Sequence, residues 1–201
     1  MIAIIDYGLG NVQAFKDVYS RLGVPALIAK SAKDLNNVAK LILPGVGSFD
    51  HAMMQLDESG MREKVEYLVI EKKIPILGVC VGMQMMANSS EEGELKGLGW
   101  IDATVKRLDL DKCAILPHMG WNDVSPNSDS KLFKNIDKNM MFYFLHEYYF
   151  DAFESANIEA TSDYGGKFTC SITKENIFGV QFHPEKSHNF GMSLLKNFAE
   201  I

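Results

Sequence analysis

An apolar run that stops at a cysteine between two glycines restricts the fold of this chain more than any other feature. Residues 74–79 are almost entirely apolar, Cys80 follows at once, and residues 83–87 have helical composition. The pattern predicts a strand, a very short turn and a helix. Gly78 and Gly82 flank Cys80 with the spacing of a nucleophile elbow, where glycines let the strand and helix approach closely and permit a strained turn.

Such a turn would give Cys80 a chemical role. Its sulfur would meet the first amides of the helix, and these favour the thiolate, which is the nucleophilic form of cysteine. A lone free cysteine is more often a small buried apolar residue. The two glycines and the change from strand to helix favour a nucleophile here.

Bulk properties limit the remaining choices. A chain of 201 residues fits one α/β domain over 1–201, and at this size folding hides roughly 70% of the unfolded surface. With a net charge of −6 and no basic run, nucleic acid and anionic membranes are poor partners. Cys80, Cys113 and Cys170 show no metal spacing, and no signal peptide or membrane span is visible. We therefore expect a cytoplasmic protein without metal or cofactor, with structural thiols at 113 and 170.

Apolar runs in the first half alternate with helical patterns. The predicted strands are 2–5, 24–29, 41–43 and 74–79. Helices are predicted from residue 12 to about 22 and over 60–73, and this alternation indicates a doubly wound, mostly parallel sheet with helices on both faces.

Shorter β-rich segments, separated by turn residues, follow residue 95. They are predicted at 101–107, 114–118, 140–150, 158–162, 168–174 and 177–182. They indicate an antiparallel portion beside the parallel one. Phe190, Leu194 and Phe198 then recur four residues apart, which predicts a closing helix.

Two glycine turns follow early strands. The turn at 6–11 only weakly resembles a phosphate loop, because it lacks a third glycine and a lysine, and we interpret it as a tight turn near the site or an interface. The turn at 44–49 could present backbone N–H groups to the oxyanion that forms when a thiolate attacks a carbonyl. Sites in parallel sheets form at the carboxyl ends of strands, where both Gly47 and Cys80 fall.

A late strand supplies the groups that a thiol nucleophile needs. The predicted strand 177–182 ends at His183, and Pro184 prevents the ladder from continuing. Glu185 follows two residues after the histidine. Either residue alone would be an ordinary strand-end histidine or a solvated charge. Together with Cys80 they offer a nucleophile, a base and an acid that orients the base.

These motifs resemble a known family. Residues 78–84 (GVCVGMQ) and 181–185 (QFHPE) are similar to the class-I, triad-type glutamine amidotransferases. Within that class the whole chain resembles the glutaminase subunits of imidazole glycerol phosphate synthase. This likeness is carried by the stretches 6–11, 44–49, 117–122, 143–146 and 185–187. Its marker is PHMGWN at 117–122, although no chemistry is assigned to His118.

The resemblance implies hydrolysis of glutamine to glutamate and ammonia. Cys80 would form a glutamyl thioester, His183 would protonate the leaving ammonia and then activate water, and Glu185 would orient His183. The amide of Val81 and the Val46–Gly47 turn would form the oxyanion hole, after rearrangement of that turn. The positions matching glutamine-binding residues are Gln84, Gly82, His146, Glu147 and Tyr148.

Glu147 departs from the family pattern. Serine or threonine usually follows the histidine of this strand, whereas this chain has a glutamate. Its carboxylate would repel the carboxylate of the substrate unless the side chain points elsewhere or pairs with a cation. The backbone of 146–148 could still bind substrate.

A partner chain is expected on chemical grounds. Ammonia released into water at neutral pH becomes mostly ammonium, which is not nucleophilic, and the amidotransferase fold would use all 201 residues. The acceptor should therefore lie on another chain. The resemblance identifies it as a (β/α)8-barrel cyclase subunit in a heterodimer that makes imidazole glycerol phosphate for histidine biosynthesis. The positions matching its interface are Asn11, Trp121, Tyr143 and Lys186.

Three other interpretations stay open at this point. A paralogous subunit could supply ammonia for amidino groups of cell-surface sugars, and Glu147 keeps that alternative in view. A cysteine hydrolase or peptidase of the same fold would turn over without a partner. An inactive scaffold would only bind a barrel, but the intact Cys80, His183 and Glu185 argue against it.

Overall fold

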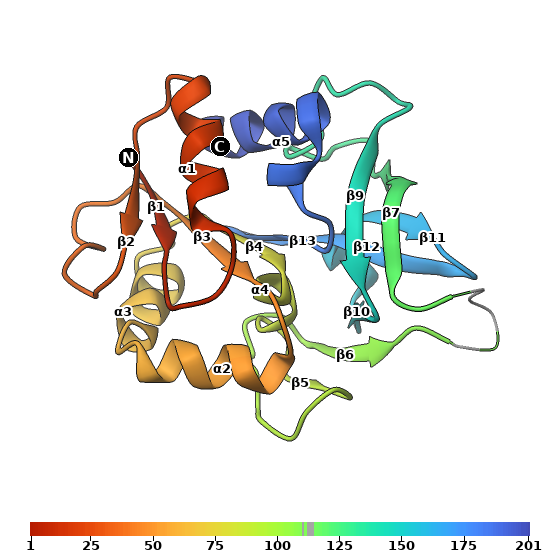
Figure 1. Cartoon of the computed structure of the whole chain (residues 1–201), viewed down its shortest axis with the longest axis horizontal. Coiled ribbons are helices and arrows are strands. Elements are labelled where there is room, and N and C mark those ends of the chain that lie inside the picture. The colour runs from red at the N-terminus through yellow and green to blue at the C-terminus, as the bar shows by residue number, and fades with distance from the viewer. Residues whose placement is uncertain (110, 112–114) are drawn as a thin grey trace.

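The computed structural model describes residues 1–109, 111 and 115–201, and its centre is an eight-stranded sheet (Figure 1). The strand order is β2-β1-β3-β4-β13-β12-β11-β8. The parallel strands are β2 (Ala26–Ala29), β1 (Ile2–Ile5), β3 (Lys40–Gly45), β4 (Ile76–Cys80) and β13 (Ile177–Val180). The antiparallel strands are β12 (Lys167–Lys174), β11 (Ile158–Asp163) and β8 (Ser125–Pro126). The predicted mixed sheet is confirmed.

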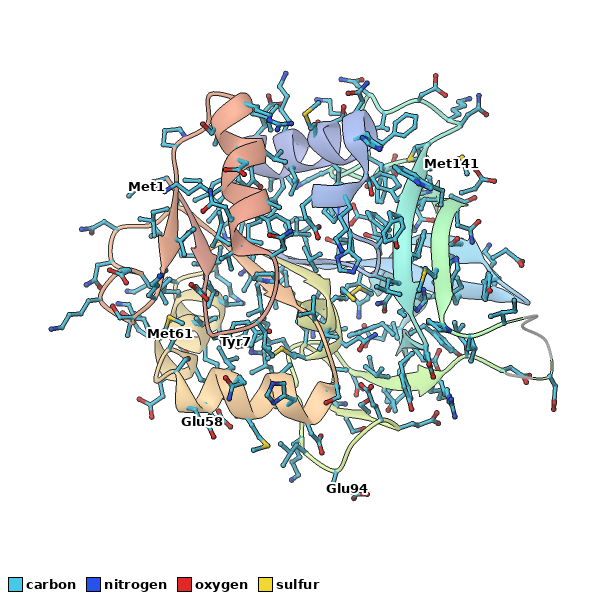
Figure 2. All side chains as sticks on the ribbon, viewed as in Figure 1. Met1, Tyr7, Glu58, Met61, Glu94 and Met141 are labelled. Atoms are coloured by element: carbon cyan, nitrogen blue, oxygen red, sulfur yellow. The ribbon has the colours of Figure 1, made fainter. Side chains whose placement is uncertain are left out.

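Helices cover both faces of the parallel part. The helices α1 (Val12–Arg21) and α5 (His188–Glu200) lie on one face, above the sheet in Figure 1, and α2 (Phe49–Glu58) and α3 (Arg62–Glu66) lie below it. A π-helical turn, Tyr67–Glu71, extends α3, and two short 3-10 turns occupy Ser155–Asn157 and Pro184–Lys186. Apolar side chains fill the space between the helices and the sheet (Figure 2).

Two small sheets stand beside the main one. The first joins β10 (Tyr148–Ala152), β6 (Ala103–Arg107) and β5 (Ser89–Ser90). The second is the antiparallel pair β7 (His118–Asp123) and β9 (Met141–His146), in which His118 lies opposite His146. The strand predicted over 140–150 is thus two strands in different sheets, because the chain changes partners at Glu147.

The pairing of β4 with β13 brings distant parts of the sequence together. Gly78 lies opposite Gly179, and Val79 lies opposite Val180, in parallel register. The chain therefore leaves the two neighbouring strands at the same edge of the sheet, at Cys80 on one and shortly before His183 on the other. The short helix α4 (Val81–Gln84) lies against this edge.

Several predicted boundaries need correction. The helix α2 was not predicted, although Phe49, Ala52, Met53 and Leu56 form its buried face. The predicted helix 60–73 is limited to α3 and the π-helical turn, and helix α4 ends earlier than predicted, at Gln84. Strand β7 begins at His118, so residues 115–117 of the predicted strand 114–118 are bends instead.

Two expectations fall partly or wholly on residues that are not described. Cys113 and Ala114 lie outside the described residues. Cys170 is fully buried on β12 with a free thiol, and burial raises its pKa well above the ordinary value, as expected of a structural cysteine. Among the described residues, no helix has both the length and the apolar character needed to cross a membrane.

Candidate active site

Cys80 lies on a strained turn between β4 and α4. Its backbone has φ 56° and ψ −117°, a positive φ that residues with a Cβ rarely adopt. A Cβ at Gly82 would overlap the carbonyl oxygen of Leu43, and one at Gly78 would come within 2.6 Å of the Met86 side chain. The two glycines therefore allow the close approach of strand and helix, and the predicted elbow geometry is confirmed.

His183 and Glu185 form a buried pair beside this turn. Nδ1 of His183 lies 3.0 Å from Oε1 of Glu185, and both side chains are almost completely buried. The backbone N–H of His183 donates to the carbonyl of Tyr143 at 2.8 Å, and Ser187 Oγ donates to the carbonyl of His183 at 2.6 Å. These bonds fix the position of the imidazole.

Cys80 and His183 are also directly coupled. Burial alone would lower the pKa of His183, but hydrogen bonds to Cys80 and Glu185 and their negative charges outweigh it and raise that pKa to about 10. A proton that leaves the sulfur of Cys80 is therefore favoured on the His183 imidazole. The three residues, predicted from two separate motifs, meet at one place.

A cavity of about 400 Å³ opens over Cys80 and His183. Its remaining lining comprises Val46, Gly47, Val81, Gln84, Glu92, Pro117, Leu145, His146, Glu147, Tyr148 and Lys186. The cavity is large enough for an amino acid, and it combines apolar walls with charged groups at its rim.

Backbone donors for an oxyanion border the cavity. Val81 is the first residue of α4, where a backbone N–H has no partner within the helix. Val46 and Gly47 line the same cavity from the turn after β3, and Gly47 has φ +88°. All three predicted oxyanion residues thus reach the cavity of Cys80.

The turn at 6–11 packs directly against the strand end that leads to Val46. The hydroxyl of Tyr7 donates to the carbonyl of Pro44 at 2.8 Å, and a Cβ at Gly10 would come within 2.7 Å of the Pro44 ring. Tyr7, labelled in Figure 2, is buried, and burial together with the charge of Cys80 raises its pKa. This agrees with the prediction of a tight turn near the site.

The predicted glutamine-binding residues occupy different places. Gln84 is buried, and its Nε2 donates to Tyr148 O and to Gln181 Oε1, each at 3.0 Å. His146 lines the cavity, and burial, followed by the nearby His118, lowers its pKa to about 3. Gly82 is not among the lining residues, because it packs against β3.

Glu147 is paired with a cation. Its Oε2 lies 2.9 Å from Nη2 of Arg107, which belongs to β6. The guanidinium of Arg107 also lies 6.0 Å from the centre of the Tyr148 ring. The pairing lessens the repulsion that an isolated carboxylate would exert on the carboxylate of the substrate. Pairing with a cation is one of the two conditions under which the sequence predicts that Glu147 is tolerated.

Glu92 is a cavity residue that sequence reasoning missed. Its Oε2 accepts a hydrogen bond from the backbone N–H of Phe49, at the start of α2, at 2.8 Å. Burial and the charges of Glu147 and Asp50 raise the pKa of Glu92 and exceed the opposing effect of that bond. Glu92 lies in a polar loop with no periodic pattern, so only its place in the cavity lining identifies it as a site residue.

Three of the four predicted interface residues lie together. Trp121 is 43% exposed, and its indole contacts Tyr143 edge to face and stacks on His188 with ring centres 5.2 Å apart. Nζ of Lys186 lies 5.8 Å from the centre of the Tyr143 ring. We call Trp121, Tyr143, Lys186 and His188 the aromatic cluster. The fourth predicted residue, Asn11, caps α1 by accepting from the Ala14 amide at 3.3 Å.

The fold has close counterparts among solved structures. A crystal structure described as glutamine amidotransferase superimposes with a TM-score of 0.77 at 18% identity, over 100% of this chain and 99% of that chain. Residues 3–201 match the model of the family described as glutamine amidotransferase class-I. Fold and site thus define a class of enzyme, and the chain belongs to the class-I glutamine amidotransferases.

Relatives within that class are closer. The chain is 54% identical to "Imidazole glycerol phosphate synthase subunit HisH" of Bdellovibrio bacteriovorus, over 100% of both chains. It is 51% identical to the subunit of the same name from Leptospira interrogans, again over 100% of both. At this identity and coverage, the chain belongs with the HisH subunits of imidazole glycerol phosphate synthase.

Proposed function

We propose that this chain is the glutaminase subunit of an imidazole glycerol phosphate synthase and supplies ammonia for histidine biosynthesis. The observation that carries the proposal is the meeting of Cys80, on its strained turn, with the buried His183–Glu185 pair in one cavity. The identity of the full-length relatives supports the pathway.

The geometry supports a thioester mechanism. The Cys80 thiolate attacks the side-chain amide carbon of glutamine, and the carbonyl oxygen becomes an oxyanion held by the amide of Val81 and by the turn at Val46 and Gly47. His183 gives its proton to the leaving nitrogen, which departs as ammonia. The same imidazole then takes a proton from water, which attacks the thioester and releases glutamate. Glu185 keeps the imidazole oriented through both steps.

The charged rim suggests how glutamine is oriented. Glu92 offers a carboxylate to the α-ammonium group of the substrate, because it borders the cavity and its bond to Phe49 uses only one of its two oxygens. Backbone N–H groups of 146–148 would hold the α-carboxylate, with the charge of Glu147 countered by Arg107. The side-chain amide of glutamine then extends toward Cys80.

The acceptor is proposed to lie on a partner. A (β/α)8-barrel cyclase subunit would dock over the cavity, on the aromatic cluster and near Asn11, and receive ammonia before it is protonated. The exposed face of Trp121 and the cation of Lys186 at the cavity rim support this position. We further propose that residues 1–201 form one amidotransferase domain, which the match over 3–201 supports, and that it acts in the reducing cytoplasm.

Substitution of the nucleophile tests the proposed chemistry. Cys80→Ala should abolish glutamine hydrolysis in the complex with the cyclase while the chain still folds and binds its partner, because the sulfur forms the covalent bond. Glutamate release measures activity, and gel filtration of the complex measures binding. Cys170→Ala removes a second buried free thiol, which does not line the cavity, and serves as the matched control. Hydrolysis that survives Cys80→Ala would contradict the assignment.

The acceptor is tested separately. Glutamine hydrolysis by the complex should be coupled to conversion of the phosphoribosyl intermediate of the histidine pathway and not to a nucleotide sugar. Coupling to the sugar alone would favour the paralogue for amidino groups. Full turnover without any partner, indifferent to glutamine, would favour a cysteine hydrolase.

A further inference from the structure

Gln181 lies against the reacting sulfur, and the steps above give it no part. It follows β13, and its side chain is completely buried. Its Nε2 lies 3.7 Å from Sγ of Cys80, within the range of an N–H···S hydrogen bond. The residue belongs to the 181–185 motif, yet it is neither the base nor the orienting acid.

Gln84 fixes which end of the Gln181 amide faces the sulfur. One atom of Gln84 lies 3.0 Å from the carbonyl oxygen of Tyr148, which can only accept, so that atom is the nitrogen Nε2. The second N–H of this nitrogen lies toward Gln181, 3.0 Å away, and must meet its oxygen. The nitrogen of Gln181 is thereby directed at Cys80.

A chain of donors holds the Tyr148 carbonyl from the other side. Nδ1 of His146 lies 2.9 Å from this carbonyl and must carry its proton, so Nε2 of His146 accepts. Nδ1 of His118 lies 2.9 Å from that acceptor and therefore donates, and Asn122 Nδ2 donates to the other nitrogen of His118 at 3.2 Å. The donors run in one direction, from Asn122 to Tyr148.

His118 and His146 stay neutral, as the direction of hydrogen-bond donation from Asn122 to Tyr148 requires. Burial lowers the pKa of His118 to about 4, and His146 is held still lower by burial and by its neighbours. The ring of His118 is stacked between Phe144 and Tyr164, with centres 4.7 and 4.0 Å away. The chain that sets the Gln181 amide is therefore packed as well as hydrogen-bonded.

The sulfur has different partners in its two protonation states. The carbonyl of Leu145 lies 3.9 Å from Sγ and can only accept, so it favours the thiol. When the proton passes from Sγ to His183, the sulfur no longer has a hydrogen to donate to Leu145. The N–H of Gln181 then faces the negative charge, and a hydrogen bond to a charged acceptor is stronger than one to a neutral acceptor.

We propose that Gln181 is a further catalytic residue, which stabilises the Cys80 thiolate through its side-chain N–H. Gln84 positions that N–H from the Tyr148 carbonyl, which the donors from Asn122 through His118 and His146 hold in place. The proposal rests on the proposed function, because it takes Cys80 to be the nucleophile. The role is distinct from the oxyanion hole, since it acts on the attacking sulfur and not on the oxygen of the substrate.

The test removes the donor and keeps the volume. In the complex with the cyclase, Gln181→Met should lower the second-order rate constant for alkylation of Cys80 by iodoacetamide about tenfold or more at neutral pH, the size expected for loss of a hydrogen bond to a charged group. kcat should fall in parallel, and KM for glutamine should stay within about twofold, because a merely structural residue would not separate these quantities. Gln181→Glu has the shape of glutamine without the donor and should lose at least as much.

Two further variants separate the role from packing. Ser171→Ala removes another buried polar group, on the adjacent strand β12, whose hydroxyl donates to the Gly179 carbonyl at 3.0 Å. Ser171→Ala should leave the alkylation rate of Cys80 unchanged. The thermal unfolding of every variant is also measured, so that a slower alkylation can be told apart from a loss of stability. His118→Phe fills the ring position without a donor and should reduce alkylation less than Gln181→Met does. An unchanged rate in His118→Phe would overturn the positioning part.

The outcomes keep the two proposals apart. If Gln181→Met and Gln181→Glu fold and alkylate at the wild-type rate while Cys80→Ala is inactive, the role of Gln181 is overturned and the glutaminase assignment stands. If Cys80→Ala still hydrolyses glutamine, the proposed function itself fails.

Discussion

At the scale of single residues, the site depends on polar groups buried in fixed protonation states. His118 and His146 are neutral in the folded chain, with pKa values of about 4 and 3, whereas the pKa of an unfolded histidine is about 6.5. Between these values the unfolded state binds protons that the folded state does not. Stability must therefore fall as pH falls through this window.

Removal of one buried histidine should change the pH dependence of stability measurably. As the pH falls from about 7 to about 5, the unfolding free energy of the wild type should fall more steeply than that of His118→Gln. The two slopes should differ by up to about 1.4 kcal/mol per pH unit, because one of the two buried histidines no longer titrates in the variant. Urea unfolding at several pH values measures the difference. His51→Gln, on the exposed side of α2, is the control and should follow the wild type. Parallel curves for His118→Gln and wild type would contradict the buried neutral pair.

At the scale of elements, the short turn Pro184–Lys186 and helix α5 form one unit that carries Glu185. Gly191 lies in the first turn of α5, where its N–H donates to Ser187 O at 3.0 Å, and a Cβ there would overlap the carbonyl oxygen of Pro184. Helix propensity alone would favour alanine by about 1 kcal/mol. The overlap is with backbone, which cannot move without moving the turn.

We expect the overlap to dominate. Gly191→Ala should destabilise the chain by about 1–3 kcal/mol and lower glutaminase activity as well, because the displaced turn carries Glu185 away from His183. Thermal unfolding and glutamate release measure the two effects. Ser193→Ala, an exposed position of the same helix, should be neutral or slightly stabilising. A stabilised and fully active Gly191→Ala would show that α5 and the turn are not tightly joined.

Some elements could be predicted from the sequence, whereas contacts between distant elements could not. The strands ending at Cys80 and near His183 follow from continuous apolar runs beside turn residues, so the triad could be predicted before any coordinates. Helix α2 is also predictable from the sequence, because Phe49, Ala52, Met53 and Leu56 follow Ser48 with helical spacing. Glu92 and the Arg107–Glu147 pair could not be predicted, because only the packing of α2 brings Glu92 to the cavity and only the pairing of β6 with β10 brings Arg107 to Glu147.

At the scale of the whole molecule, the cavity and the proposed docking surface share residues. Lys186 belongs both to the cavity lining and to the aromatic cluster, so a partner on this surface reaches the site directly. The isolated chain should therefore show low glutaminase activity, rising by roughly 5–150-fold when the cyclase and its ligand are added, the usual range of coupling between sites.

Two exposed aromatic residues test this coupling. Trp121→Ala should weaken the stimulation by the cyclase, whereas Phe153→Ala, outside the aromatic cluster and 58% exposed, should leave it unchanged. Titration of glutamate release against the cyclase measures both. Full activity of the isolated wild-type chain would contradict the coupling.

The register of β4 beside β13 has a consequence for synthesis of the protein. Gly78 and Gly179, which lie opposite each other beside the reactive centre, are separated by about half of the 201 residues, and His183 and Glu185 follow the second strand. A nascent chain on the ribosome carries the sulfur long before it carries the imidazole. Reactivity toward glutamine must therefore wait until His183 and Glu185, which follow β13, have been translated. A nascent chain that ends before these residues cannot consume glutamine before a partner can use the ammonia.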